Sequence, residues 1–167
     1  MKIKIINIFT ALSLIMISGC AGAAKPADAQ NSNASVSQID FSDMQGKDWN
    51  LAELQIGGER TSFSRSGLAA EGFEQIFTIR FEDGRVSGIG APNRFFAPYA
   101  LGEGDAIKIS TIAGTLMAAF REPEQLREHE YFSLLQNVSG WNFADGRLIL
   151  RSANESGAEA LLIFTLE

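Results

Sequence analysis

Few residues in this sequence could carry out catalysis or bind a metal ion. It contains one histidine, His129, and one cysteine, Cys20. A zinc site built from these residue types needs several more ligands, and a serine or cysteine nucleophile would have only His129 as a base. The nearest cluster, Glu128-His129-Glu130, cannot converge on one ion because neighbouring helical residues point in different directions. We therefore predict no catalytic residue, no metal site and no cofactor. The cluster is interpreted as a solvated face, with hydrogen bonding to a nearby turn as the alternative for Glu128.

A hydrolase would need other acidic residues to meet in a cleft. Three aspartates, Asp83, Asp105 and Asp145, each lie in a turn signal, which explains them without catalysis. Nothing in the sequence places two of them together as a glycosidase pair. The residues around Gly88 lack the order of a G-x-S-x-G nucleophile elbow, and no helix opens after Gly90 as a nucleotide-binding fingerprint requires. A hydrolase is therefore the least favoured interpretation.

Residues 81–99 form the stretch around which the rest of the chain is organised. Gly88 and Gly90 lie within a strand pattern, where glycines at this density indicate a bulge, a bend or a close backbone approach. The stretch predicts a corner of a small β-barrel, with a ligand loop as the less favoured alternative. Strand alternation places Phe95 and Phe96 on opposite faces, so that one of them stays at the surface or lines a cavity mouth.

Length and charge limit the possible partners. The chain has 167 residues, which suits one domain rather than two, and its twelve phenylalanines can supply a substantial core. Its formal net charge of −6 argues against nucleic acid or anionic lipid as an electrostatic partner.

The N-terminus has the pattern of a bacterial lipoprotein signal. Lys2 and Lys4 precede an apolar run at residues 5–17, which is too short for an ordinary membrane span. The sequence ISGC at residues 17–20 resembles a lipobox that ends at the lipid-accepting cysteine. The alternatives are a signal peptide that is cut elsewhere and a membrane anchor in which the cysteine is buried.

The lipobox predicts a signal peptide over residues 1–19 and membrane attachment through acyl chains on Cys20. The residue after the cysteine is Ala21 rather than aspartate, a pattern typical of Gram-negative lipoproteins that are exported to the outer membrane. We therefore expect the protein to lie in the bacterial cell envelope, on the periplasmic face of the outer membrane. Residues 20–38 include a polar run without apolar periodicity and predict a flexible tether. The folded domain would then cover residues 39–167.

Short strands and glycine turns fill this domain. Alternating apolar and polar residues predict strands near residues 49–54, 61–63, 73–81, 85–89, 94–101, 106–110, 140–143, 147–151 and 160–166. Residues 64–72 predict a surface loop, with a helical turn at residues 68–71 as the alternative.

Apolar residues occur at helical spacing only at residues 122–138. Pro123 suits the first turn of a helix there, and Gly140 suits its C-terminal cap. The apolar residues of this segment share one face. The fold class predicted is mainly β (α+β): a small antiparallel, barrel-like curved sheet with one α-helix near residues 122–138.

Several short motifs from about residue 46 onward resemble the META domain family, the family of the heat-shock lipoprotein HslJ. They are a W-x-L start, an F-x-x-D-G-x-V-x-G hairpin, a glycine-asparagine turn before an aromatic residue, a T-x-M-A segment and a helix with glutamate and apolar residues. The positions that carry these motifs, as structural or binding candidates, are Trp49, Gly88, Gly90, Asn93, Phe95, Thr115, Met117 and Glu128.

The resemblance implies a small β-barrel-like fold with one helix that is exported and usually lipid-anchored. It also implies a link to stress response and drug tolerance without an established enzymatic activity. Two cysteines common in the family are replaced by Ala91 and Ala119, and we expect these positions to face each other. The favoured function is a non-enzymatic envelope protein that acts through protein contacts or envelope maintenance. The alternative is a carrier that holds an apolar ligand in the barrel or under the helix.

Overall fold

The computed structural model describes residues 39–118 and 121–166, all of which lie in the compact unit Ser37–Glu167. The predicted signal peptide, Cys20 and the tether lie outside the described residues. The described elements, in chain order, are η1 Phe41–Met44, β1 Trp49–Ile56, β2 Glu59–Ser62, α1 Arg65–Ala70, β3 Thr78–Glu82, β4 Arg85–Ile89, β5 Arg94–Leu101, β6 Ile107–Ile109, β7 Ala113–Gly114, α2 Glu128–Gln136, β8 Gly140–Ala144, β9 Arg147–Ala153 and β10 Glu159–Thr165.

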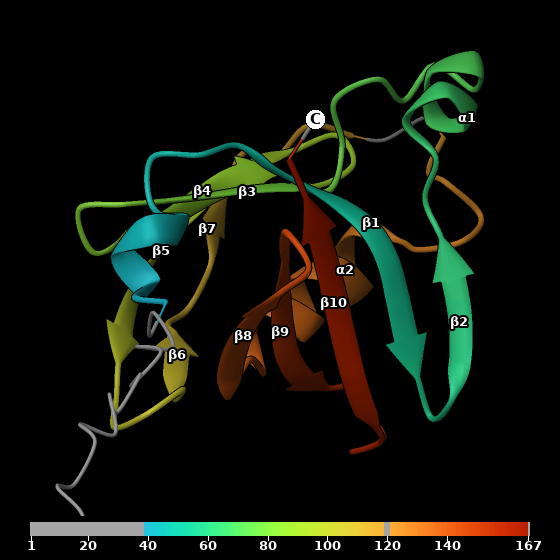
Figure 1. Ribbon diagram of the computed structural model, residues 1–167. Helices are drawn as coiled ribbons and strands as arrows, with labels where there is room; N and C mark the ends of the chain where they lie inside the picture. The colour runs from blue at the N-terminus through green and yellow to red at the C-terminus, as the bar shows by residue number, and fades with distance from the viewer. Residues whose placement is uncertain (1–38, 119–120, 167) are drawn as a thin grey trace, which may run out of the picture. The chain divides into compact units, whose positions relative to one another are not determined.

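One antiparallel sheet contains the described strands, in the order β6-β5-β4-β3-β1-β10-β9-β8, with β2 paired to β1 and β7 paired to β5. Figure 1 shows β1 and β10 side by side. The end strands β6 and β8 approach each other through an isolated bridge, Ala106↔Gly140. The sheet is therefore nearly closed as a barrel with one unsealed seam, which confirms the predicted fold class.

An ion pair crosses this seam. Arg151 on β9 contacts Asp105, beside β6, at 2.8 Å. A Cβ at Gly140 would lie 2.0 Å from the Arg151 guanidinium, so glycine leaves the space through which this side chain passes. The prediction of a helix cap at Gly140 was wrong, because the residue begins β8 and its lack of a side chain serves the ion pair.

Aspartate-glycine turns join the hairpins as predicted. Asp83 and Gly84 connect β3 to β4 with φ angles of 48° and 73°. Asp145 and Gly146 connect β8 to β9 with φ angles of 53° and 74°. Positive φ at both central residues matches the right-handed twist of the strands, which explains this dipeptide at both positions.

Large apolar side chains fill the space that the sheet encloses. Alternate positions on β9 and β10 point inward, and their partners across the sheet do the same. The largest fully buried side chains are Trp49, Tyr131, Phe77, Phe81, Phe164, Met44, Leu51, Ile79, Leu135, Leu148, Leu150 and Leu162. Within the described residues, no helix combines the length and the apolar character needed to span a bilayer.

The helix α2 is shorter than predicted. It begins at Glu128, and residues 122–127 are not α-helical. Two acids still serve its N-terminus: the Glu122 carboxylate accepts the N–H of Glu128 at 3.3 Å, and the Glu130 carboxylate accepts the N–H of Arg127 at 2.8 Å. The acidic residues therefore indicated correctly that a helix begins nearby, but the predicted start at residue 122 was too early. Glu122 lies outside the helix and accepts a hydrogen bond from its first turn.

Two other segments differ from expectation. Residues 64–72 were predicted as a loop, with a helical turn at residues 68–71 as the alternative. They contain the longer helix α1, which Ser64 caps by accepting the N–H of Gly67 at 3.3 Å. The strand predicted from residue 73 begins only at Thr78, because Phe77 adopts a φ of 55°, which interrupts an extended backbone. The expected pairing of Ala91 with Ala119 remains a prediction, since Ala119 lies outside the described residues.

Tyr131 on α2 is fully buried among aromatic rings, including Phe77 at 5.1 Å and Phe95 at 6.1 Å between centroids. Its hydroxyl donates to the Thr78 carbonyl at 3.2 Å. Burial raises the pKa of Tyr131 well above its ordinary value, because the phenolate would lose its hydration.

This pKa shift predicts how stability depends on pH. The neutral phenol is favoured in the folded state, so its contribution is fully present below the unfolded-state pKa of about 10. It is lost as pH rises toward the folded-state pKa, and the free energy of unfolding should fall by up to about 1.4 kcal/mol per pH unit. Urea denaturation of Tyr131→Phe should show a weaker alkaline loss than the wild type. Tyr99→Phe, at the chain's other tyrosine, is the comparison: burial also raises the pKa of Tyr99, but this side chain is only half-buried, so its removal should change the slope less. Equal slopes for Tyr131→Phe and wild type would contradict the prediction.

Candidate functional site

The connection between β4 and β5 is a tight turn held from within and from α2. The N–H of Gly90 donates to the carbonyl of Asn93 at 2.7 Å, and the Ala91-Pro92 peptide is cis. Both Ala91 and Asn93 are buried. Buried backbone N–H groups in such a turn need acceptors, and the sheet does not supply all of them.

Glu128, the first residue of α2, supplies these acceptors. Its Oε1 atom accepts the N–H groups of Ala91 and Asn93 at 2.6 Å each, and its Oε2 atom accepts the Asn93 side-chain Nδ2 at 2.7 Å. The alternative that the sequence left open for Glu128, hydrogen bonding to a nearby turn, is confirmed. These bonds to a charged acceptor are the strong kind.

The Asn93 side chain carries the network onward to the segment after β7. Its Oδ1 atom accepts the Thr115 hydroxyl and the Met117 N–H at 2.7 Å each, while Nδ2 also donates to the Met117 carbonyl at 3.2 Å. Together with the bond to Glu128, both donor hydrogens and both acceptor lone pairs of the amide are used. Asn93 therefore joins a turn, a helix and a third segment.

Gly88 and Gly90 are required by close approach. A Cβ at Gly88 would lie 1.9 Å from the Thr78 carbonyl oxygen. A Cβ at Gly90 would lie 2.6 Å from Glu128 Oε1 and 2.8 Å from the Phe132 ring. Both positions fit the predicted corner of the barrel, because any side chain there would push apart groups that are hydrogen-bonded or packed.

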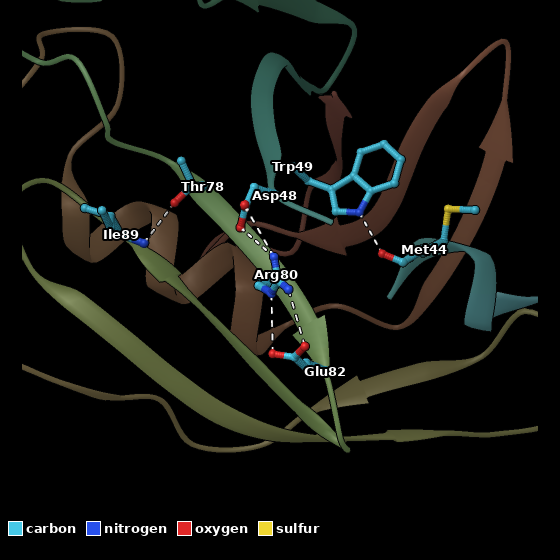
Figure 2. Close-up of polar contacts among 7 residues, drawn as sticks. All are labelled: Met44, Asp48, Trp49, Thr78, Arg80, Glu82 and Ile89. Carbon is cyan, nitrogen blue, oxygen red and sulfur yellow. Dashed lines mark hydrogen bonds and ion pairs between the residues drawn. The ribbon is translucent and has the colours of Figure 1, made fainter. Parts of the chain in front are cut away.

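Phe95 completes this region, and Trp49 lies apart from it. The Phe95 ring is buried and packs edge-on against Phe132 at 5.2 Å. Trp49 lies in the core beside η1, where its Nε1 donates to the Met44 carbonyl at 2.9 Å (Figure 2). The structure thus gathers the other motif residues at one end of β4 and β5. Met117 takes part through its backbone, since its side chain is exposed.

The acidic residues considered for catalysis do not form such a cluster. Asp83 and Asp145 occupy hairpin turns, and Asp105 is paired with Arg151. Within residues 39–118 and 121–166, no group of three or more histidine, cysteine, aspartate or glutamate residues is placed to hold a metal ion. The hydrogen bonds of Glu128 and Asn93 hold backbone, so the geometry of this cluster is that of a structural centre.

Sequence reasoning missed a polar surface on the outside of β3, β4 and β5. A hollow of about 720 Å³ lies there. On its β3 side Arg80 contacts Glu82 at 3.3 Å and Asp48 at 3.4 Å (Figure 2). These two carboxylates raise the pKa of Arg80. The available signal was an arginine at an outward position of each of three consecutive strands.

The close approach at Gly88 leads to a stability prediction. Gly88→Ala should lower the free energy of unfolding by at least about 2 kcal/mol, because the new methyl group collides with backbone rather than with a flexible side chain. Gly67→Ala is the matched control, since its Cβ meets only ordinary contacts with Ser64. On a helix it should stabilise by up to about 1 kcal/mol. Urea denaturation measures both, and an unchanged Gly88→Ala midpoint would contradict the prediction.

The network leads to a second prediction. Glu128→Ala should destabilise by about 2–4 kcal/mol, because it leaves buried N–H donors without an acceptor. Glu128→Gln should recover only part of this loss, since its NH₂ group would face Nδ2 of Asn93 as a second donor. Glu124→Ala, at an exposed carboxylate nearby, should stay within about 0.5 kcal/mol of wild type. Denaturation curves in which Glu128→Ala and Glu124→Ala coincide would contradict the structural role.

The fold is similar to those of two solved protein structures. An NMR structure of a protein from Burkholderia xenovorans is 19% identical, with 76% of this chain and 86% of that chain covered and a TM-score of 0.55. A crystal structure of a DUF4847 family protein from Bacteroides vulgatus is 15% identical, with 75% and 95% covered and a TM-score of 0.49. At such identity the first likeness shows a shared fold alone.

No curated protein sequence matches the chain. The sequence profile of the META domain matches residues 42–163, which span every described strand except the end of β10. The motifs noted in the sequence fall within this range, and most of them meet in the cluster around Asn93. The chain therefore belongs to the META domain family.

Proposed function

We propose that this chain is a non-enzymatic, lipid-anchored protein of the bacterial cell envelope that acts through protein contacts or envelope maintenance under stress or drug exposure. Membership in the META domain family supports an envelope-type protein. The basic and apolar residues before Cys20, followed by the ISGC sequence, support attachment through lipid. The periplasmic face of the outer membrane is the location that this signal favours.

One observation carries the non-enzymatic part of the proposal. The residues best suited to chemistry at the motif cluster, Glu128 and Asn93, use their polar atoms to hold the β4–β5 turn and the backbone of Met117. A general base or a nucleophile partner needs a polar atom that can reach a substrate. In this cluster the motif residues hold the backbone in place and so fix the shape of the surface. This arrangement favours a protein that binds a partner over one that catalyses a reaction.

A second candidate, the carrier of an apolar ligand, has one observation in its favour. A hollow of about 400 Å³ lies between α2 and β1, under the helix. Four of its lining residues, Leu54, Ile56, Leu126 and Leu134, are apolar, and the other eight are polar or charged. Because large side chains fill the barrel interior, this hollow is the place where an apolar ligand would bind. Native mass spectrometry of the full chain should then detect a bound lipid that Leu134→Trp removes, and a wild type without bound mass would count against the carrier.

The lipid anchor is tested at Cys20. Cys20→Ser removes the thiol that would receive the acyl chains, so the protein should move from the membrane fraction to the soluble fraction or remain unprocessed. Fractionation of a Gram-negative host, with immunoblotting and mass spectrometry of the N-terminus, measures both outcomes. Ser18→Ala is the matched control, because it keeps a small residue before the cysteine and should leave the location unchanged. A Cys20→Ser variant that is processed and fractionates like wild type would overturn the lipid-anchor proposal.

A further inference from the structure

The outer face of β3, β4 and β5 is defined by their register. Each outward position on one strand lies opposite an outward position on the next. The three cross-strand rows are Glu82, Arg85 and Pro98; Arg80, Ser87 and Phe96; and Thr78, Ile89 and Arg94. Directly opposed side chains are neighbours on a sheet. The sizes of the side chains in the middle row therefore determine where this face is raised and where it is hollow.

The middle row produces the hollow. Ser87 is small and lies between two large side chains, Arg80 and Phe96. The resulting hollow has a volume of about 720 Å³, within the range of small-molecule sites. It lies on paired strands, so its walls are held by backbone hydrogen bonds.

Charge is distributed unequally across the hollow. On the β3 side, Arg80 is paired with two carboxylates, Asp48 and Glu82, so this side carries more negative than positive charge. On the β5 side, Arg85 and Arg94 form no ion pair with any residue that the structure describes. Glu82 lies directly opposite Arg85 in the register, yet it contacts Arg80. The unbalanced positive charge therefore lies on the β4 and β5 side.

An exposed aromatic ring lies beside these cations. Phe96 is 48% exposed, while its neighbour Phe95 is 3% exposed, as the predicted alternation requires. The guanidinium group of Arg85 lies over the Phe96 ring, 5.0 Å from its centroid. Arg94 precedes Phe96 by two residues on the same face, which is about 7 Å along a strand. The ring is thus flanked by one stacked cation and one cation that remains available.

We propose that this hollow binds a small aromatic monoanion, such as an aryl carboxylate. Its ring would lie over Ser87 against Phe96, and its acidic group would pair with Arg94. The distance between Arg94 and Phe96 suits an acid attached directly to a one- or two-ring system, and a guanidinium pairs well with a carboxylate. Asp48, Glu82 and Asp83 line the opposite side and repel ligands with several negative charges. The side chains proposed to bind the ligand take no part in the lipid anchor or in the side-chain hydrogen bonds of Glu128 and Asn93, and Arg94 meets that network only through its backbone bonds to Thr115.

The probe for the test is 2-naphthoate, with 2-naphthalenemethanol as a neutral analogue of the same ring system. Isothermal titration of the purified full chain should show tighter binding of the naphthoate. Arg94→Gln should weaken naphthoate binding roughly tenfold, the effect of one charge-assisted pair, and change binding of the alcohol less than about twofold. Phe96→Ala should weaken both ligands, since it removes the surface on which their rings stack.

Arg147→Gln is the matched control, because it removes one exposed cation from β9, outside the hollow. Its affinity for naphthoate should equal that of wild type. The proposal is overturned if Arg147→Gln and Arg94→Gln weaken binding equally, if Phe96→Ala binds like wild type, or if wild type binds no naphthoate at millimolar concentration. An acidic peptide that binds wild type more tightly than naphthoate would also overturn it. Arg94 bonds Thr115 through its backbone, so thermal melting of Arg94→Gln should match wild type.

Discussion

The half-buried carboxylate of Glu128 is the constraint on which this end of the molecule depends. A turn between two strands leaves N–H groups that the sheet cannot pair, and in a buried turn each of them must find an acceptor. One side chain at the start of α2 accepts two of them and orients Asn93, whose amide then fixes the segment at Met117. The helix, the sheet corner and the third segment therefore hold one another in place. Strands β4 and β5 leave this turn in a fixed direction, and so does the face that carries Phe96.

Local signals made much of the fold predictable. The aspartate-glycine dipeptides determine two hairpins because few other residues accept positive φ at both turn positions. Period-two alternation identified most of the strands and placed Phe95 and Phe96 on opposite faces, because adjacent side chains of a strand point to opposite sides. Which of the two is buried was known only from the structure. The role of Gly88 and Gly90 in close backbone approach was also predictable. Glycine density within a strand points to a neighbour that needs the space of a side chain.

What could not be predicted depends on residues far apart in the chain. The start of α2 was placed too early, because a proline flanked by acids resembles a first turn until Glu122 is seen to reach Glu128 from outside the helix. Gly140 resembled a cap, and only the path of Arg151 toward Asp105 gives its actual role. The partners of Glu128 lie more than thirty residues away, and no periodicity encodes such a contact. The hollow beside Phe96 likewise exists only once the register of three strands is known.

The pairing of β1 with β10 has a consequence for how the domain is made. The first long strand of the chain lies in the middle of the sheet, and its partner over residues 50–56 is the last strand. Until β10 has been synthesised, Leu51 and Leu54 have no neighbour on that side of β1. Contacts of such sequence separation form late. The centre of the sheet can therefore form only once β10 has been made, so that the two ends of the domain must come together before its core is enclosed.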